Sequence, residues 1–469
     1  MACRDLFFAN NCNIIANKPD SKIITFVSKL MVMLLIYTHK KTKRVNYTFK
    51  LVFDLLLKID FELTSNSDKY LAHTDPKFTY STRSFGKELF FQASDLLFQT
   101  GVEGQDLNIF TFEKNKALFP VHSHSSALPF DVFAATFFMV TRYEEYLPYM
   151  SDRFGRFEAP QSISSKNEFL RKPVVNIWAN KIKELLKSAF PELVFGERKF
   201  SYVSTIDIDS AYAYKYKGTV RSIGGMVSSL FRFEFQKIIE RVLVIAGLQK
   251  DPFDTYAFQL QLLKTYKFTP IYFILLGDYG KFDKNIPFNS RHFQTLIKSL
   301  GDYAAVGIHP SYQSNNNLNK LKTEIERLSS ILNREITKSR QHFLKLTFPS
   351  TYRNLINLDI TDDYTMGYAA EPGFRAGICD PFYFYDLDLE TETTLLIHPF
   401  QVMEGTLKDY MYKTKEQSLE IIKLLIDEVK AVDGTFVSLW HNESLSNADR
   451  WKGWHELYVE TIRYACEGR

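Results

Sequence analysis

The chain has 469 residues, 45% of them hydrophobic and 24% charged, which is typical of a globular protein with room for two or three domains. Its formal net charge of +4 is too small to predict a nucleic-acid partner. The four cysteines have neither metal-type spacing nor a disulfide pattern, so we expect a reducing, cytoplasmic compartment.

The first 30 residues show no pattern of core positions, and we expect a poorly organised extension ahead of a start at Met31 or Met33. The most apolar stretch, 23–37, is shorter than the roughly 20 residues that cross a bilayer. It also lacks the basic start and the cleavage site of a signal peptide. We therefore predict no integral membrane segment.

Residues 31–195 are expected to form a smaller N-terminal α+β domain. Strand-like segments lie at 33–38, 77–80, 88–91 and 117–121, and helical patterns at 46–57, 129–147 and 173–186. A short polar hinge at 191–197 marks the predicted boundary, after which residues 196–469 form a second domain.

From residue 199 onward, strands and amphipathic helices alternate, which predicts a parallel α/β architecture, either a barrel or an open doubly wound sheet. The expected strands are 200–208, 268–275, 304–308, 341–346, 363–366, 394–398 and 435–440. Helices are expected at 318–332 and after a capping box formed by Thr414 and Gln417. In both architectures the reactive groups gather at the carboxyl ends of the strands.

Reactive side chains follow nearly every strand of this part. The first strand ends in Asp207 and Asp209, which point the same way because side chains two apart on a strand share a face. Two carboxylates so close together resist joint ionisation unless a cation or a proton offsets their charge. Four histidines stand at the ends of other segments: His309, His342, His398 and His441. We therefore predict one functional cluster.

Such a cluster supports metal-assisted hydrolysis. An aspartate with two neutral imidazoles suits zinc or a related divalent ion and leaves positions open for water and substrate. The ion can lower the pKa of bound water to about 7 and polarise a carbonyl oxygen. A second carboxylate can then take the proton of the water, and another histidine can protonate a leaving amine.

The order of these motifs resembles the NodB-type polysaccharide deacetylases, carbohydrate esterase family 4. The segments similar to its first, second and last motifs are Thr205–Asp209, His309–Gln313 and Val437–His441. The segment Arg340-Gln-His342 stands where the R-x-P motif of that family would fall. The resemblance covers roughly residues 199–445. It implies a distorted (β/α) barrel of about seven strands, and removal of N- or O-acetyl groups from glycans.

The resemblance also implies roles for individual residues. Asp207 corresponds to the catalytic base and Asp209 to a metal ligand, while His441 corresponds to the catalytic acid. Arg340 would orient Asp207.

The second motif departs from the family pattern. His309 matches the first ligand of that motif, but Gln313 replaces the second histidine. We expect His342 to supply the missing ligand, because it lies in the segment that replaces the R-x-P motif.

More narrowly, four segments are similar to a bacterial branch of this family that carries an N-terminal domain of unknown function. They are Gly307–Tyr312, Arg340–Lys345, Gly373–Gly377 and Leu439–Asn442. That domain begins with a run much like residues 33–39, which favours the later start.

Three residues keep two interpretations each. Arg375 lies either near an anionic or sugar group or in a surface turn. Trp440, next to His441, suits stacking on a sugar, although burial is the default for a strand tryptophan. His398 either lines the pocket or is structural.

We predict a divalent-metal-dependent hydrolase, with zinc as the expected ion, that deacetylates a bacterial glycan or glycan precursor. A catalytically impaired glycan-binding or scaffolding protein is the alternative, because of Gln313. A hydrolase of another acyl group or amide is the third hypothesis. The sequence does not indicate an oligomeric state.

Overall fold

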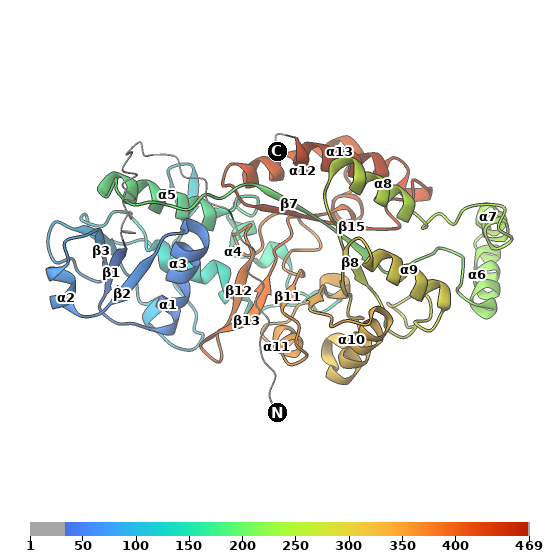
Figure 1. Cartoon of the computed structure of the whole chain (residues 1–469), viewed down its shortest axis with the longest axis horizontal. Helices are drawn as coiled ribbons and strands as arrows, with labels where there is room; N and C mark the ends of the chain where they lie inside the picture. The colour runs from blue at the N-terminus through green and yellow to red at the C-terminus, as the bar shows by residue number, and fades with distance from the viewer. Residues whose placement is uncertain (1–32, 468–469) are drawn as a thin grey trace, which may run out of the picture. The chain divides into compact units, whose positions relative to one another are not determined.

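The computed structural model describes residues 33–467, which belong to one compact unit, Val32–Arg469. The expectation for the first 30 residues lies outside this range. No helix within residues 33–467 has the length and apolarity needed to cross a membrane. Two parallel sheets organise the described chain, one on each side of the predicted boundary near residue 195 (Figure 1).

The first sheet has four parallel strands in the order β2-β1-β3-β4. They are β1 (Leu34–Thr38), β2 (Phe61–Thr64), β3 (Lys77–Ser81) and β4 (Leu89–Gln92). Helices α1 (Lys43–Phe49) and η1 (Lys50–Leu57) connect β1 to β2, and α2 (Ser67–Ala72) connects β2 to β3. Because the strands are parallel and helices connect the first three, this part is α/β rather than the expected α+β.

Three more helices and a hairpin complete this part: α3 (Val132–Val140), α4 (Ile163–Lys166), α5 (Val174–Ala189), β5 (Phe110–Phe112) and β6 (Asn115–Ala117). Asp131 begins α3 by accepting hydrogen bonds from the amides of Phe133 and Ala134. The predicted helix over 129–147 is therefore shorter than expected. It stops because Arg142, with φ 55°, adopts a left-handed conformation that a helix cannot continue through.

The second sheet has nine strands in the order β12-β13-β11-β10-β9-β8-β7-β15-β14. They are β7 (Ser201–Ile208), β8 (Ile271–Ile274), β9 (Ala305–Ile308), β10 (Lys338–Ser339), β11 (Asp362–Asp363), β12 (Phe382–Asp386), β13 (Thr391–Ile397), β14 (Val402–Met403) and β15 (Thr435–His441). All pairs are parallel except β12 with β13. The predicted α/β class is confirmed. A closed barrel is not shown, because the described strands leave β12 and β14 as sheet edges.

Helices lie between and after the strands of this sheet along the chain. They are α6 (Thr219–Phe231), α7 (Phe235–Ile245), α8 (Tyr256–Tyr266), α9 (Arg291–Gly301), α10 (Leu318–Leu332), α11 (Ser350–Ile356), α12 (Lys415–Lys430) and α13 (Trp454–Cys466). Helices α9 and α10 pack against β9, and α12 packs against β15. The capping box predicted from Thr414 and Gln417 opens α12.

The predicted strand at 341–346 is wrong. The strand β10 ends at Ser339, and His342–Leu344 form a 3₁₀ turn, η6. Phe343 and Leu344 have φ angles of 61° and 53°, which an extended strand does not permit. Hydrophobic residues in this segment gave the pattern of a strand although the backbone turns there.

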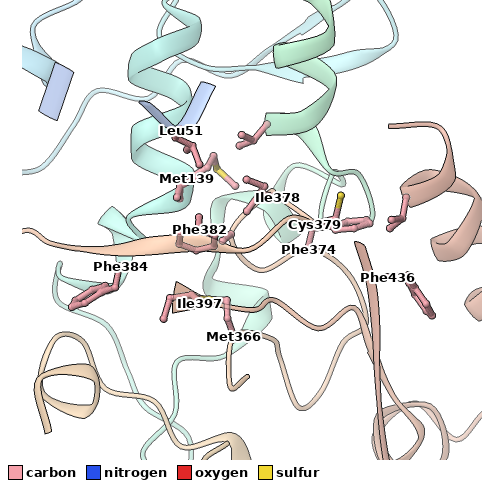
Figure 2. Close-up of a cluster of buried hydrophobic side chains, with 14 of the residues drawn as sticks. Leu51, Met139, Met366, Phe374, Ile378, Cys379, Phe382, Phe384, Ile397 and Phe436 are labelled. Carbon is pink, nitrogen blue, oxygen red and sulfur yellow. The ribbon is translucent and has the colours of Figure 1, made fainter. Parts of the chain in front are cut away.

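One hydrophobic core is shared by both parts of the chain. Figure 2 shows Leu51 and Met139 from the N-terminal part in one cluster with Phe382 and Ile397 from β12 and β13. At Gly377 an added Cβ would lie 3.0 Å from the Met139 side chain, so the chain approaches α3 closely there.

A buried ionic cluster crosses the same boundary. The carboxylate of Glu145 accepts hydrogen bonds from Arg142 Nε at 2.8 Å and from Arg375 Nε at 2.9 Å. Burial opposes ionisation of Glu145, but the two guanidinium groups hold its pKa below the usual range. This carboxylate therefore neutralises two arginines that have little access to water.

Replacing Glu145 by Gln should destabilise the protein by roughly 3–5 kcal/mol, because buried Arg375 would lose its counter-charge and Arg142 would keep only Glu144. Urea unfolding followed by circular dichroism measures the change. Glu184→Gln on α5 is the matched control, since that side chain is 70% exposed and its loss should have little effect. Equal stability of the two variants would contradict a stabilising role for the cluster.

Candidate functional site

Five of the predicted residues meet at the carboxyl edge of the second sheet. Parallel register places His441, the last residue of β15, beside Asp207 of β7. Asp209, His309 and His342 follow β7, β9 and β10. All five line one cavity of about 280 Å³. The sheet order explains this convergence, because β15, β7, β8, β9 and β10 are consecutive neighbours.

Asp209, His309 and His342 form a group that can hold a metal ion. One ligand atom from each lies within 4.8 Å of the others. His309 Nε2 is 3.1 Å from Asp209 Oδ1, and His342 Nε2 is 3.4 Å from Asp209 Oδ2. A carboxylate and two imidazoles form a donor set that divalent zinc accepts.

The opposite nitrogen of each imidazole is held by a hydrogen bond. His309 Nδ1 donates to the backbone carbonyl of Arg340 at 2.6 Å, and His342 Nδ1 donates to Asp283 Oδ1 at 2.9 Å. These bonds fix both rings with Nε2 directed to Asp209. Such outer partners are usual for histidines that bind metals. Asp283 was missed in the sequence because nothing in its spacing distinguishes it from other loop acids.

The arrangement fits a cation between the three side chains. The hydrogen bond to the Arg340 carbonyl occupies His309 Nδ1, so Nε2 is the ring nitrogen that faces Asp209. Within the described residues, the buried Oδ1 of Asp209 has no hydrogen-bond partner. His309 Nε2 and Asp209 Oδ1 lie 3.1 Å apart, so one cation could take both atoms as ligands.

A strained turn places His342 in the group. The amide of His342 donates to the carbonyl of Pro310 at 3.1 Å, which ties the turn to the segment after His309. The next residue, Phe343, has a left-handed backbone, a conformation that costs about 1–3 kcal/mol at sites held by surrounding structure. Arg156 from the N-terminal part donates to the Phe343 carbonyl at 3.0 Å. That part therefore supports the turn that carries a candidate ligand.

Asp207 is buried and held by Arg340. Its Oδ1 accepts a hydrogen bond from Arg340 Nη1 at 3.2 Å. The guanidinium is fixed in turn by Thr205 Oγ1 at 2.5 Å and by the carbonyl of Tyr364 at 2.9 Å. The other oxygen, Oδ2, lies 3.8 Å from His309 Nε2. Arg340 therefore holds one oxygen of Asp207 by a hydrogen bond.

His441 pairs with a buried acid that the sequence analysis missed. Its Nδ1 donates to Glu404 Oε1 at 2.7 Å, and its Nε2 lies 3.8 Å from Asp209 Oδ2. Burial would lower the pKa of His441, but Glu404, Asp209 and Asp207 raise it well above the ordinary value. Glu404 follows β14, a two-residue strand too short for its pattern to be recognised in the sequence.

The carboxylates and histidines of the metal group shift each other's pKa values. Burial would lower the pKa of His342, but Asp209 and Asp283 raise it to about 9. Burial would raise the pKa of Asp209, whereas His342 and His309 bring it well below the ordinary range. Without a bound cation, His342 therefore carries a proton that balances these acids.

Two predicted residues, Arg375 and Trp440, do not line this cavity. Arg375 is buried against Glu145 and donates to the Gly367 carbonyl at 2.9 Å, while it lines a neighbouring cavity. Trp440 is buried, with its ring 4.9 Å from that of Tyr458. Neither side chain is placed to contact a ligand near Asp209.

The remaining histidine and the motif glutamine also lie elsewhere. His398 Nε2 is 2.8 Å from Asp362 Oδ1, and its ring stacks on Tyr364. Gln313 Oε1 accepts a hydrogen bond from Lys320 on α10. Gln313, which occupies the position of the second motif histidine, therefore lies outside the metal group. His342 lies beside Asp209 instead.

Residues 34–191 match the model of a family of unknown function, DUF7033. The match covers the part that supplies Arg156. No curated protein matches the chain.

Solved structures similar to the chain are polysaccharide deacetylases or relatives of them. A "putative polysaccharide deacetylase" from Mycobacterium smegmatis is 12% identical over 58% of this chain and 86% of its own, with a TM-score of 0.38. A polysaccharide deacetylase from Bacillus cereus is 11% identical over 58% and 87%, with a TM-score of 0.27. A CE4 family pseudoenzyme from Bacillus anthracis is 11% identical over 55% and 61%, with a TM-score of 0.26. Because these scores are low, the function proposed below rests on the side chains of the site.

Asp209→Asn should abolish binding of zinc or cobalt, because the amide removes the one charged ligand. His342→Ala should weaken binding strongly, and Asp283→Asn by about 10–100-fold through loss of the outer hydrogen bond. Isothermal titration calorimetry of chelator-treated protein measures these affinities.

Gln313→Ala is the matched control and should bind metal as the wild type does. Unchanged affinity in His342→Ala, or a loss in Gln313→Ala, would contradict the ligand set.

Proposed function

We propose that the protein is a metal-dependent hydrolase that removes acetyl groups from N- or O-acetylated sugars of a cytoplasmic bacterial glycan precursor or sugar conjugate. The observation that carries the proposal is the convergence in one cavity of a three-ligand group with a buried carboxylate and a carboxylate-paired histidine. The motif resemblance in the sequence supports the acetylated sugar as the substrate class.

The proposed ion is zinc, held by Asp209, His309 and His342. A divalent ion supplies a Lewis acid that lowers the pKa of water and polarises the carbonyl of an acetamide or ester. Hydrogen bonds at Nδ1 keep the two histidines oriented with Nε2 toward Asp209. The ligand side chains would therefore need little rearrangement to bind an ion.

Asp207 is proposed as the general base. Arg340 holds Oδ1, which leaves Oδ2 as the oxygen that can receive the proton of an attacking water. The aspartate is only 2% exposed, so bulk water does not compete strongly for that oxygen. Removing such a base typically costs about 10²–10⁴-fold in rate.

His441 is proposed as the general acid. Its Nδ1 proton is held by Glu404, so the proton on Nε2 is the one that can be given to the leaving amine or hydroxyl. Glu404 also stabilises the imidazolium form. Pairing with Glu404 therefore keeps His441 protonated until it transfers the Nε2 proton to the leaving group.

The cavity has space for more than an acetyl group. A second cavity of about 400 Å³ shares Arg156, Leu344, Ala369 and Tyr410 with the first. A sugar chain that extends from the reacting acetyl group could occupy it. The N-terminal part would then form part of the substrate groove through Arg156.

Asp207→Asn should lower acetate release by about 10²–10⁴-fold while metal binding is retained, because the base is lost and the ligands remain. Acetate is measured with zinc or cobalt over a panel of N-acetylated oligosaccharides and sugar conjugates. Undiminished activity in this variant would contradict the mechanism. A wild type that binds no metal and releases no acetate would favour the glycan-binding alternative.

Glu404→Gln should move the alkaline limit of activity to lower pH. The acid must carry its proton, so activity is present below the pKa of His441 and lost as pH rises through it. Because Glu404 raises that pKa, its removal lowers the pH at which activity falls. The pH dependence of kcat measures the shift, with Glu443→Gln at the rim as control. An unchanged alkaline limit would contradict the role of Glu404.

A further inference from the structure

Helices α6 and α7 carry a row of exposed apolar side chains. Figure 1 shows the two helices side by side, apart from the sheet. The exposed residues of α6 are Val220, Ile223, Val227, Leu230 and Phe231, and those of α7 are Phe235, Ile239, Val242 and Ile245. Each is at least 45% exposed. Such a group of apolar residues is larger than the scattered exposures usual on a monomer.

The apolar residues recur with helical spacing, yet they are not the residues that join the helices. Arg241 of α7 lies across Gly225 of α6, where an added Cβ would overlap its guanidinium, and Arg241 Nη1 donates to the Ser222 carbonyl at 3.3 Å. Ser229 and Val244 are the buried residues of the two helices. The apolar stripes therefore remain free for a partner.

The turn between the helices is aromatic and carries an exposed arginine. It reads Phe231-Arg232-Phe233-Glu234-Phe235, and both Phe231 and Phe233 are 79% exposed. Phenylalanine has no polar atom that could favour such exposure. Arg232 between them is also exposed. A cation flanked by bare aromatic rings suits a boundary where an apolar phase meets anionic groups.

The hairpin and its flanks are positively charged. Residues 219–245 contain four basic and two acidic residues, and with the flanking lysines residues 215–250 reach a net charge of +5, whereas the whole chain carries +4. The rest of the chain is therefore slightly negative. Two copies joined through this surface would bring two such positive segments together, which opposes self-association and favours a negatively charged partner.

We propose that the α6–α7 hairpin docks on a membrane surface that carries anionic headgroups. The apolar stripes and Phe231 and Phe233 enter the boundary between headgroups and acyl chains, and the basic residues contact the headgroups. The hairpin lies on the surface and does not span the membrane, because each of its helices is shorter than the roughly 20 residues needed. This docking requires no reaction at the metal group, so it stands or fails independently of the proposed function.

The hairpin is also close to the candidate active site. A cavity of about 750 Å³ is lined by Gly225 and Arg232 at one end and by Glu443, Arg450 and Trp451, which also line the metal-site cavity. Docking through the hairpin would therefore bring the entrance of the site near the membrane surface.

The test is sedimentation of the full chain with vesicles. Wild-type protein should sediment with vesicles of phosphatidylglycerol and phosphatidylcholine, much less with phosphatidylcholine alone, and less at high salt. The double variant Phe231→Ser/Phe233→Ser should lose most of this binding while its circular dichroism spectrum and melting temperature are unchanged. Leu424→Ser is the matched control, because Leu424 is 61% exposed on α12 and should not contribute.

Failure of the wild type to sediment with any vesicle would overturn the proposal, as would equal binding of the double variant. Analytical ultracentrifugation of the wild type and the double variant measures whether the hairpin joins two copies of the chain. A stable dimer of the wild type that becomes a monomer in the double variant would show that the hairpin joins two copies, and would also overturn docking on a membrane.

Discussion

An excess of carboxylates at the carboxyl edge of the second sheet is the constraint on which the site depends. The acids are Asp207, Asp209, Asp283 and Glu404, and the sole arginine in direct contact with them in the described structure is Arg340. Buried charges of one sign are tolerated only when cations or protons balance them. In the protein alone the imidazoles provide this balance, which explains the raised pKa values of His342 and His441. A divalent ion would replace the proton on His342.

The framework around these charges comes from both parts of the chain. Parallel strands bring Asp207 and His441 side by side, whereas His342 depends on the strained turn at Phe343. Arg156 of the DUF7033-matching part holds the carbonyl of that turn. The shared core and the Glu145 cluster also join the two parts. The N-terminal part is thus connected to the geometry of the site through identifiable contacts.

Strand periodicity was sufficient to predict the α/β class and the meeting of Asp207, Asp209 and His309, because the ends of parallel strands share an edge. His342 lies beside Asp209 and His309 in the structure, although its segment was predicted as a strand. The outer acids Asp283 and Glu404 could not be found, since their roles depend on loops that come together only in three dimensions. Burial likewise decides the position of Trp440, which the sequence leaves open.

The most direct test of the account is the position of a bound ion. A crystal of the protein soaked in zinc should show one anomalous peak at the zinc absorption edge, within coordination distance of Asp209, His309 and His342, with Zn–N distances of about 2.0–2.1 Å. The same peak should be absent in Asp209→Asn. A peak held by Glu404 and His441 instead, or no ordered zinc in the wild-type crystal, would contradict the assignment of the metal centre.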